Sequence, residues 1–199
     1  DPNTGRESYY LNNGTSNARN TTVNPNEAKK VIIGNHETKI EGGFSNNITW
    51  KFIDFGLNFT FSLGGKAFDA ATWQHNNGNY TFGGQLPTYY DINKMWTGPG
   101  DTNASQPVFQ YGNSSEVSSR WLMPTDYLRL KSLTLGFTAP SHWVTHIGLS
   151  KARAFFSASN LLTWKSKDLY VDPEMRVDGV CTFQTPALRT FTFGIELGF

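Results

Sequence analysis

The last ten residues alternate strictly between apolar and polar side chains, and this pattern constrains the fold of the chain most. The apolar parity is occupied by Phe191, Phe193, Ile195, Leu197 and Phe199, and the other parity by small or polar residues. A period of two places successive side chains on opposite faces of a β-strand. The sequence therefore predicts a final strand with one apolar, largely aromatic face.

The same alternation recurs in earlier segments. Residues 40–50 and 54–63 predict a hairpin with its turn near residues 50–52, and each arm has about ten residues, enough to cross a bilayer at a tilt. Residues 127–137 change parity, and a β-bulge near Lys131 and Ser132 would place all their leucines and Phe137 on one face. Residues 151–162 alternate weakly, and we assign their even positions to the outward face.

Long polar segments separate these strands on one side only. Short turns are expected near residue 51 and at 139–148, whereas residues 64–119 and 165–187 lack periodicity and are rich in Gly, Asn and Pro. We predict two regions: residues 1–38 as a polar loop leading into the strands, with a short strand near 31–33, and residues 39–199 as barrel strands. Segments 64–119 and 165–187 are then long extracellular loops, which large membrane barrels carry on their outer side.

The predicted fold is all-β and forms part of a transmembrane antiparallel barrel. Large aromatics occupy the apolar faces, and Trp50 lies near a strand end, where a membrane aromatic girdle belongs. About five strands are found, fewer than the eight of the smallest single-chain barrels, and no signal peptide opens the chain. We therefore expect a fragment of a longer polypeptide, although closure by oligomerisation is an alternative. A soluble β-sandwich carbohydrate-binding module remains the other reading of the alternation.

The residues offer little chemistry. The net charge of +1 argues against a nucleic-acid partner, and the single cysteine, Cys181, excludes an internal disulfide and is expected to be a small buried or loop residue. His142 and His146 follow a proline and lack the glutamate of a zinc-protease helix, so we predict a periplasmic turn. We find no Ser/His/Asp set for a barrel enzyme and predict no enzymatic activity. The last loop could offer calcium oxygen ligands, but their spacing is not that of an EF-hand: Asp168, Asp172, Glu174 and Asp178.

Several motifs, in order, resemble the SusC/RagA-type TonB-dependent transporters of Bacteroidetes. Residues 127–140 are similar to the family signature YLRLKNLTLGYTLP, and residues 156–164 to its S-x-x-N-L-L-T-W strand. Residues 172–174 match its DPE loop, and residues 186–195 its P..RTFTFGI ending. Upstream, Ile33-Gly34-Asn35 and residues 42–46 match its IGN…GGFSN hairpin. The resemblance covers residues 31–63 and 120–199.

The resemblance implies the last strands of a 22-strand outer-membrane barrel that imports oligosaccharides or peptides. It implies as partners the plug and remaining strands of the same transporter, a SusD-like surface lipoprotein, the TonB–ExbB–ExbD complex acting through an N-terminal part, the barrel-assembly machinery, and lipid or lipopolysaccharide. The family often has a D-x-N-G-D-G stretch, of which residues 1–6 keep little. We therefore predict no cofactor, with calcium there as the weaker alternative.

Two sets of residues are candidate functional residues. Exposed aromatics stack on sugar rings, so those in or beside the first long loop are candidates for cargo contact: Trp73, Tyr89, Tyr90, Trp96 and Trp121. The apolar stripe of the last strand resembles the C-terminal signal read by the barrel-assembly machinery. The sequence does not identify the cargo.

Overall fold

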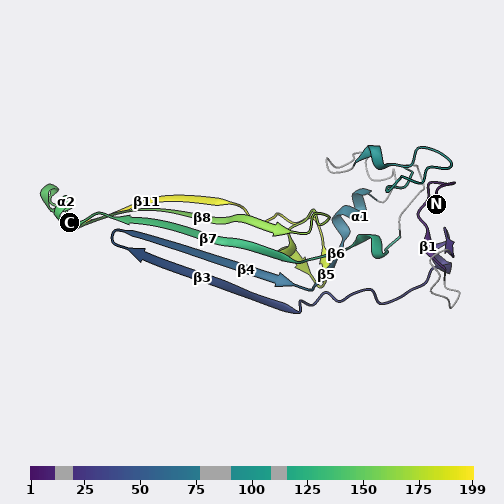
Figure 1. The fold of residues 1–199 in the computed structure, drawn as a ribbon, viewed down its shortest axis with the longest axis horizontal. Helices are drawn as coiled ribbons and strands as arrows, with labels where there is room; N and C mark the ends of the chain where they lie inside the picture. The colour runs from purple at the N-terminus through teal and green to yellow at the C-terminus, as the bar shows by residue number, and fades with distance from the viewer. Residues whose placement is uncertain (12–19, 77–90, 109–115) are drawn as a thin grey trace. The chain divides into compact units, whose positions relative to one another are not determined.

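The structure is a computed structural model that describes residues 1–11, 20–76, 91–108 and 116–199, and β-strands dominate it (Figure 1). Its elements, in chain order, are β1 Tyr9–Tyr10, β2 Thr21–Thr22, the 3₁₀ turn η1 Pro25–Glu27, β3 Ile40–Trp50, β4 Ile53–Leu63, β5 Lys66–Asp69, α1 Ala70–Asn76, η2 Ile92–Lys94, η3 Ser119–Trp121, β6 Leu122–Pro124, β7 Tyr127–Thr138, α2 Ser141–Val144, η4 Thr145–Ile147, β8 Lys151–Lys165, η5 Pro173–Met175, β9 Arg176–Val177, β10 Val180–Cys181 and β11 Thr190–Gly198.

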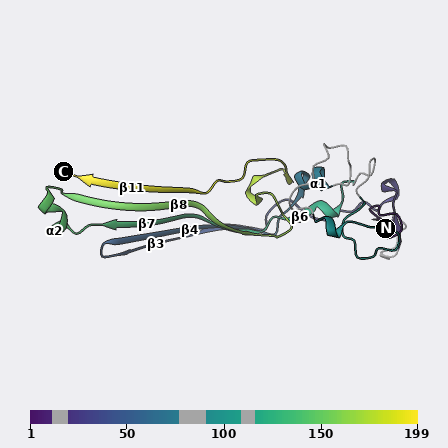
Figure 2. The same cartoon turned by 90° about the horizontal axis from the view of Figure 1, so that it is seen from above.

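Five long strands form one antiparallel sheet in the order β11-β8-β7-β4-β3. Figures 1 and 2 show these strands side by side, with α2 at the end where the β3–β4 turn lies. The predicted hairpin is confirmed, since β3 and β4 have 11 residues each and Ile40 pairs with Leu63. Lys51 makes the tight turn at a left-handed φ of 55°. The strand predicted at 151–162 runs on to Lys165.

The bulge predicted in the third strand is confirmed. The pairing of β7 with β4 shifts between Asn58 and Phe59, so that Lys131 has no opposite residue. The neighbouring strand β8 compensates at the same level, where Asn160 adopts a left-handed φ of 53° and the pairing with β7 shifts between Leu130 and Ser132. The two irregularities bring the apolar residues on both sides of Lys131 onto the same face of the sheet.

The short strand expected at 31–33 is wrong. These residues have no regular structure, and Ile32 is 98% exposed. Residues 31–33 belong to none of the sheets formed by the described residues. The first strand pair lies earlier, between β1 and β2. The long loops also contain short elements, including α1, η2, η5 and the parallel pairing of β5 with β10.

The chain divides into two compact units. Unit 1 comprises Asp1–Gly34, Phe68–Leu122 and Val180–Thr182, and unit 2 comprises Asn35–Ala67, Met123–Gly179 and Phe183–Phe199. Unit 1 buries Trp121 and Cys181. Burial of Cys181 agrees with the expectation of a small buried or loop residue. Unit 2 contains the five-stranded sheet. The predicted division into residues 1–38 and 39–199 stays a prediction. Within the described ranges, no helix has the length and apolar character needed to cross a membrane.

Candidate functional site

One face of the five-stranded sheet is apolar from edge to edge. A single cross-strand row shows this: Ile48, Phe55, Leu135, Phe156 and Phe193 are successive pairing partners from β3 to β11. The ring of Phe156 lies 4.9 Å from that of Phe193 between centroids. The even positions of β8 therefore share the face of the β11 stripe, as the sequence predicted.

This apolar face is exposed, although its side chains are large. Phe193 and Ile195 are 79% and 76% exposed, and the other members exposed by 40% or more are Ile40, Phe44, Ile48, Trp50, Ile53, Leu63, Leu128, Leu135, Phe137, Leu162, Trp164, Phe191, Leu197 and Phe199. Soluble monomers rarely expose a contiguous apolar patch of this extent. A sandwich would cover such a face with a second sheet, which the described residues do not do.

The opposite face of the sheet is polar and carries ion pairs. Arg153 on β8 donates to Asp54 on β4 at 2.7 Å, across the intervening strand β7. Gly136 of β7 pairs directly with Asp54 and lies beneath this ion pair. A Cβ on Gly136 would collide with the Asp54 carboxylate and would come within 2.6 Å of Arg153 Nη2. The glycine therefore provides the space in which the two charges meet.

A buried ion cluster holds the loop after β8 on this polar face. Arg129 of β7, whose side chain is only 3% exposed, donates from Nη1 to Glu174 and from Nη2 to Asp172, each at 2.6 Å. Lys131 donates to the same Glu174 oxygen at 2.8 Å. Pro173, between the two acids, is fully buried. We call this arrangement the rim clamp, because it fastens the loop to the loop end of the sheet.

The electrostatics of Asp172 fit this role. Burial raises the pKa of its carboxyl, but hydrogen bonds from Arg129 and from the backbone N–H groups of Glu174 and Ala187 outweigh that effect. The net pKa lies below the usual value of 3.8, so Asp172 is charged at neutral pH. Two of the four acids considered as calcium ligands thus have basic partners in the rim clamp.

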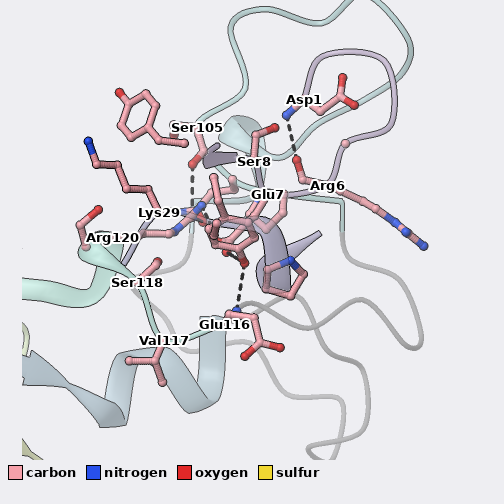
Figure 3. Close-up of a pocket in the computed structure, with 18 of the residues that line it drawn as sticks. Asp1, Arg6, Glu7, Ser8, Lys29, Ser105, Glu116, Val117, Ser118 and Arg120 are labelled. Carbon is pink, nitrogen blue, oxygen red and sulfur yellow. Dashed lines mark hydrogen bonds and ion pairs between the residues drawn. The ribbon is translucent and has the colours of Figure 1, made fainter. Parts of the chain in front are cut away.

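Unit 1 contains a hollow of about 1530 Å³ with a mixed charged lining (Figure 3). Arg120 forms an ion pair with Glu7 at 3.0 Å and donates to the Ser105 carbonyl at 3.2 Å. Tyr9 donates its hydroxyl proton to Glu7 and accepts from the Glu116 N–H, both at 3.2 Å. Segments far apart in sequence therefore meet here, and the arrangement offers carboxylate, guanidinium and hydroxyl groups to a polar ligand.

Tyr9 is held in its neutral form. Burial raises the pKa of its phenol, the Glu116 N–H lowers it, and the nearby Glu7 raises it again, with a net upward shift. The phenol therefore remains a donor across the physiological pH range. Lys29 also lines the hollow.

The aromatics predicted to contact cargo fall in different environments. Trp96 lines the hollow, donates from Nε1 to the Pro2 carbonyl at 2.8 Å and packs on Gly5, whose φ of 67° and missing Cβ make room for the ring. Trp73 lies on α1 with its ring 5.9 Å from that of Phe68. Trp121 is 3% exposed, beside Arg120. Tyr89 and Tyr90 lie outside the described residues, and cargo contact stays a prediction for all five.

The other candidate residues lie on the edge strand β11 and on the turn between β7 and β8. All members of the predicted assembly signal are on β11 or follow it, and Phe199 is 94% exposed. Its role in assembly stays a prediction. His142 and His146 lie on the short helical turn α2–η4 between β7 and β8. On this turn the ring centroid of Trp143 lies 6.4 Å from that of Phe137. No cluster of metal-ligating side chains is found among the described residues.

Sequence comparison finds relatives of one kind. The chain is 29% identical over 187 residues to TonB-dependent receptor P3 of Formosa agariphila, covering 86% of this chain and 17% of the relative. It is 22% identical over 183 residues to TonB-dependent receptor P26 of the same organism, covering 85% of this chain and 18% of the relative. The chain is a homologue of TonB-dependent receptors. It spans less than a fifth of the length of these relatives, and no family model matches it.

Solved structures give the fold of this receptor homologue. The RagAB peptide transporter matches all of the chain with a TM-score of 0.76 at 24% identity, and 22% of that transporter chain is covered. The RagAB importer in its closed-closed state matches with a TM-score of 0.74. The predicted resemblance and the fold, a segment of an antiparallel transporter barrel, are confirmed. The relatives are receptors and transporters rather than enzymes.

Sequence reasoning missed the rim clamp and the ion pair of the hollow. One signal for the clamp was visible, since Arg129 places a charged side chain on the polar face of β7 between Leu128 and Leu130. A charge on the inner face of a strand calls for a partner. The sequence does not place Glu7 beside Arg120, because nothing periodic connects the two segments.

Proposed function

We propose that the chain is the C-terminal barrel segment of a transporter that imports oligosaccharides or peptides across the bacterial outer membrane together with a SusD-like surface lipoprotein. The observation that carries the proposal is the apolar face that continues across all five strands, opposite a polar face with ion pairs. Lipid on one side and a water-filled lumen on the other require this division of a barrel wall. Homology to TonB-dependent receptors supports it.

In this proposal the segment forms part of the barrel wall and of its extracellular rim, and it does not couple import to an energy source. In the proposed cycle, cargo is captured between the lipoprotein and the barrel, and the TonB–ExbB–ExbD complex then pulls on a plug that belongs to another part of the protein. Cargo passes through the opened lumen. The rim clamp keeps one loop folded on the inner face at the loop end of the sheet, and β11 presents its stripe to the barrel-assembly machinery and then to lipid.

The charged lining of the unit 1 hollow supports peptide cargo. A peptide presents backbone amides and charged side chains or termini, which the Glu7–Arg120 pair and Tyr9 can match with hydrogen bonds. The structurally similar RagAB is a peptide transporter. Trp96, on the border of the hollow, supports the oligosaccharide alternative, since an aromatic face stacks on a sugar ring.

Location is tested first with the full-length protein in its native host. The protein should fractionate with the outer membrane, require detergent for extraction and migrate faster on a gel before boiling than after. Recovery of the full-length protein as a soluble folded monomer without detergent would contradict the barrel proposal and favour a soluble binding module.

Cargo and partner are tested together. The transporter should co-purify with a surface lipoprotein, and mass spectrometry of the complex should identify bound peptide or oligosaccharide. Uptake of a labelled peptide pool and of a labelled oligosaccharide pool is then compared between wild type and Glu7→Gln, with Glu27→Gln as an exposed control in the same unit. Uptake of neither pool, in a protein that is folded in the membrane, would overturn the import proposal.

A further inference from the structure

The loop after β8 folds back onto the polar face of the sheet, and cations of that face hold it there. Lys165, the last residue of β8, has the parity of the polar face. Its ammonium group donates to the Val171 carbonyl at 2.6 Å. Arg129 and Lys131 hold the next residues of the loop through the rim clamp. Residues 166–174 are therefore fastened to β7 and β8 at more than one point.

The two sides of this segment differ in burial. Leu169 is 1% exposed, Pro173 is fully buried, and the side chain of Asp172 is 7% exposed. Tyr170 lies between these residues in the sequence, yet it is 48% exposed. Arg129, on the strand beneath the segment, is only 2% exposed, as expected where the loop covers the polar face. Tyr170 therefore belongs to the side of the segment that faces away from the sheet.

The direction of that exposed side follows from the proposed barrel. The apolar face of a barrel wall contacts lipid, so the polar face lines the lumen. A segment fastened to the polar face at the loop end of the sheet lies inside the extracellular mouth of the lumen and reduces its width. Its exposed side is then directed toward the barrel axis, along which cargo passes. An aromatic side chain in this position offers a flat apolar surface to a sugar ring or to an apolar side chain of a peptide.

We propose that residues 166–174 form a constriction inside the extracellular mouth of the barrel and that Tyr170 is a cargo-contacting residue of this constriction. The inference rests on the proposed import function. The rim clamp positions the segment, and the ring of Tyr170 makes the contact. The feature of the cargo that it recognises is an apolar surface, which either cargo class can carry. Tyr170 lies outside the first long loop, so this contact is additional to the aromatics predicted there from the sequence.

The placement is tested by thiol labelling of the full-length transporter in intact cells, with wild type as the blank. Cys181 is only 1% exposed and should contribute little background. A small maleimide should label Tyr170→Cys, whereas a maleimide with a long poly(ethylene glycol) chain should react slowly, because it does not fit beside a docked segment. Adding Arg129→Gln should raise labelling by the large reagent about a hundredfold, since loss of the buried ion pair opens the segment. Arg153→Gln, the matched control on the polar face, should leave this labelling unchanged.

The contact is tested by uptake of two labelled probes, a tryptic digest of casein and a partial hydrolysate of mixed plant polysaccharides. The pool that wild type imports is used to compare the variants. Tyr170→Ala should raise the concentration for half-maximal uptake about fivefold, as expected for the loss of one aromatic contact, and should not lower the maximal rate. Tyr170→Phe keeps the ring and should stay near wild type. Phe183→Ala removes a 60% exposed ring of the same loop outside residues 166–174 and should have no effect.

The outcomes separate this proposal from the proposed function. If the large reagent labels Tyr170→Cys as fast with the rim clamp intact as with Arg129→Gln, residues 166–174 do not narrow the mouth, and the constriction is wrong. If Tyr170→Ala reaches the surface and takes up cargo with the half-saturation of wild type, the contact is wrong, while import by wild type still supports the transporter. If wild type imports neither pool or never reaches the outer membrane, the proposed function fails, and this inference fails with it.

Discussion

Replacing Arg129 by glutamine should release the loop at residues 166–189 from the sheet. The guanidinium makes two charge-assisted hydrogen bonds of 2.6 Å, to Asp172 and to Glu174, and its side chain is almost fully buried. Glutamine is too short and carries no charge, so both carboxylates would lose their main partner. Asp172 itself is 7% exposed and would become a buried charge with only backbone donors.

The size of the effect follows from this burial. Removing one partner of a buried ion pair costs about 3–5 kcal/mol, which corresponds to roughly two to three and a half powers of ten in the docking equilibrium. Lys131 offsets part of this cost, because it stays within 2.8 Å of Glu174. The lower end of the range, about a hundredfold, is therefore the expected increase in the undocked population.

Limited proteolysis of intact cells measures that population. Trypsin has sites after Lys167, Arg176 and Arg189 in this loop, and cleavage that requires a rapid opening of the segment follows the equilibrium population of the open form. Initial cleavage of Arg129→Gln should be about a hundred times faster than that of wild type. Arg129→Lys, which keeps the charge but loses the two-pronged geometry, should fall between them.

A matched control separates loop release from general loss of stability. Arg153 also pairs with a carboxylate on the polar face, but its side chain is 26% exposed and its partner 32%. Such half-exposed pairs contribute at most about 1 kcal/mol, so Arg153→Gln should leave loop cleavage near the wild-type rate. If Arg129→Gln is heat-modifiable and surface-located yet is cleaved no faster than wild type, the rim clamp does not hold the loop.

Three further predictions concern single residues. The folded-state pKa of Asp172 lies below its usual 3.8, so its contribution to the docking of the loop is intact at pH 5 and is lost as the pH falls below 3.8. Below that pH, cleavage of the loop by pepsin should rise in the wild type relative to Asp172→Asn. Gly136→Ala should displace the Asp54 carboxylate, cost about 1–3 kcal/mol and lower the heat-modifiability midpoint, unlike Gly98→Ala, which meets nothing within 4 Å. Deleting Phe199 should reduce surface levels far more than cargo affinity; normal surface levels would refute this.

The sheet was predictable because its determinants are local. Alternation gave the faces of β3, β4 and β11 without knowledge of any contact, and the change of parity in the third segment located the bulge at Lys131. Even the weakly alternating β8 was assigned correctly, because Phe156 must share a face with its large neighbours. One-sided burial fixes register strongly, since a slip of one residue would turn every apolar side chain to the wrong face.

The loop contacts were not predictable, because their determinants are distant in sequence. Arg129 meets Asp172 and Glu174 across 43 and 45 residues, and the path of the intervening chain decides whether they meet. The sequence indicated only that a charged side chain such as Arg129 on a strand needs a partner, without indicating which residue it is. The hollow of unit 1 is a stronger case, since Glu116 lies 107 residues from Tyr9. Its Tyr9, Glu7 and Arg120 have no shared periodicity that would bring them together.

The sheet also explains why the chain depends on further strands. Strands β3 and β11 each have one neighbour, so one row of backbone N–H and C=O groups on each remains without a strand partner in this sheet. In water these groups are hydrated, but in the hydrocarbon of a bilayer each costs several kcal/mol. The apolar face, however, is satisfied only in lipid. Water would require the apolar face to be covered by protein, and lipid requires the strand edges to be paired. The five strands therefore suit lipid only when other strands of the barrel pair with Ile40–Trp50 and Thr190–Gly198.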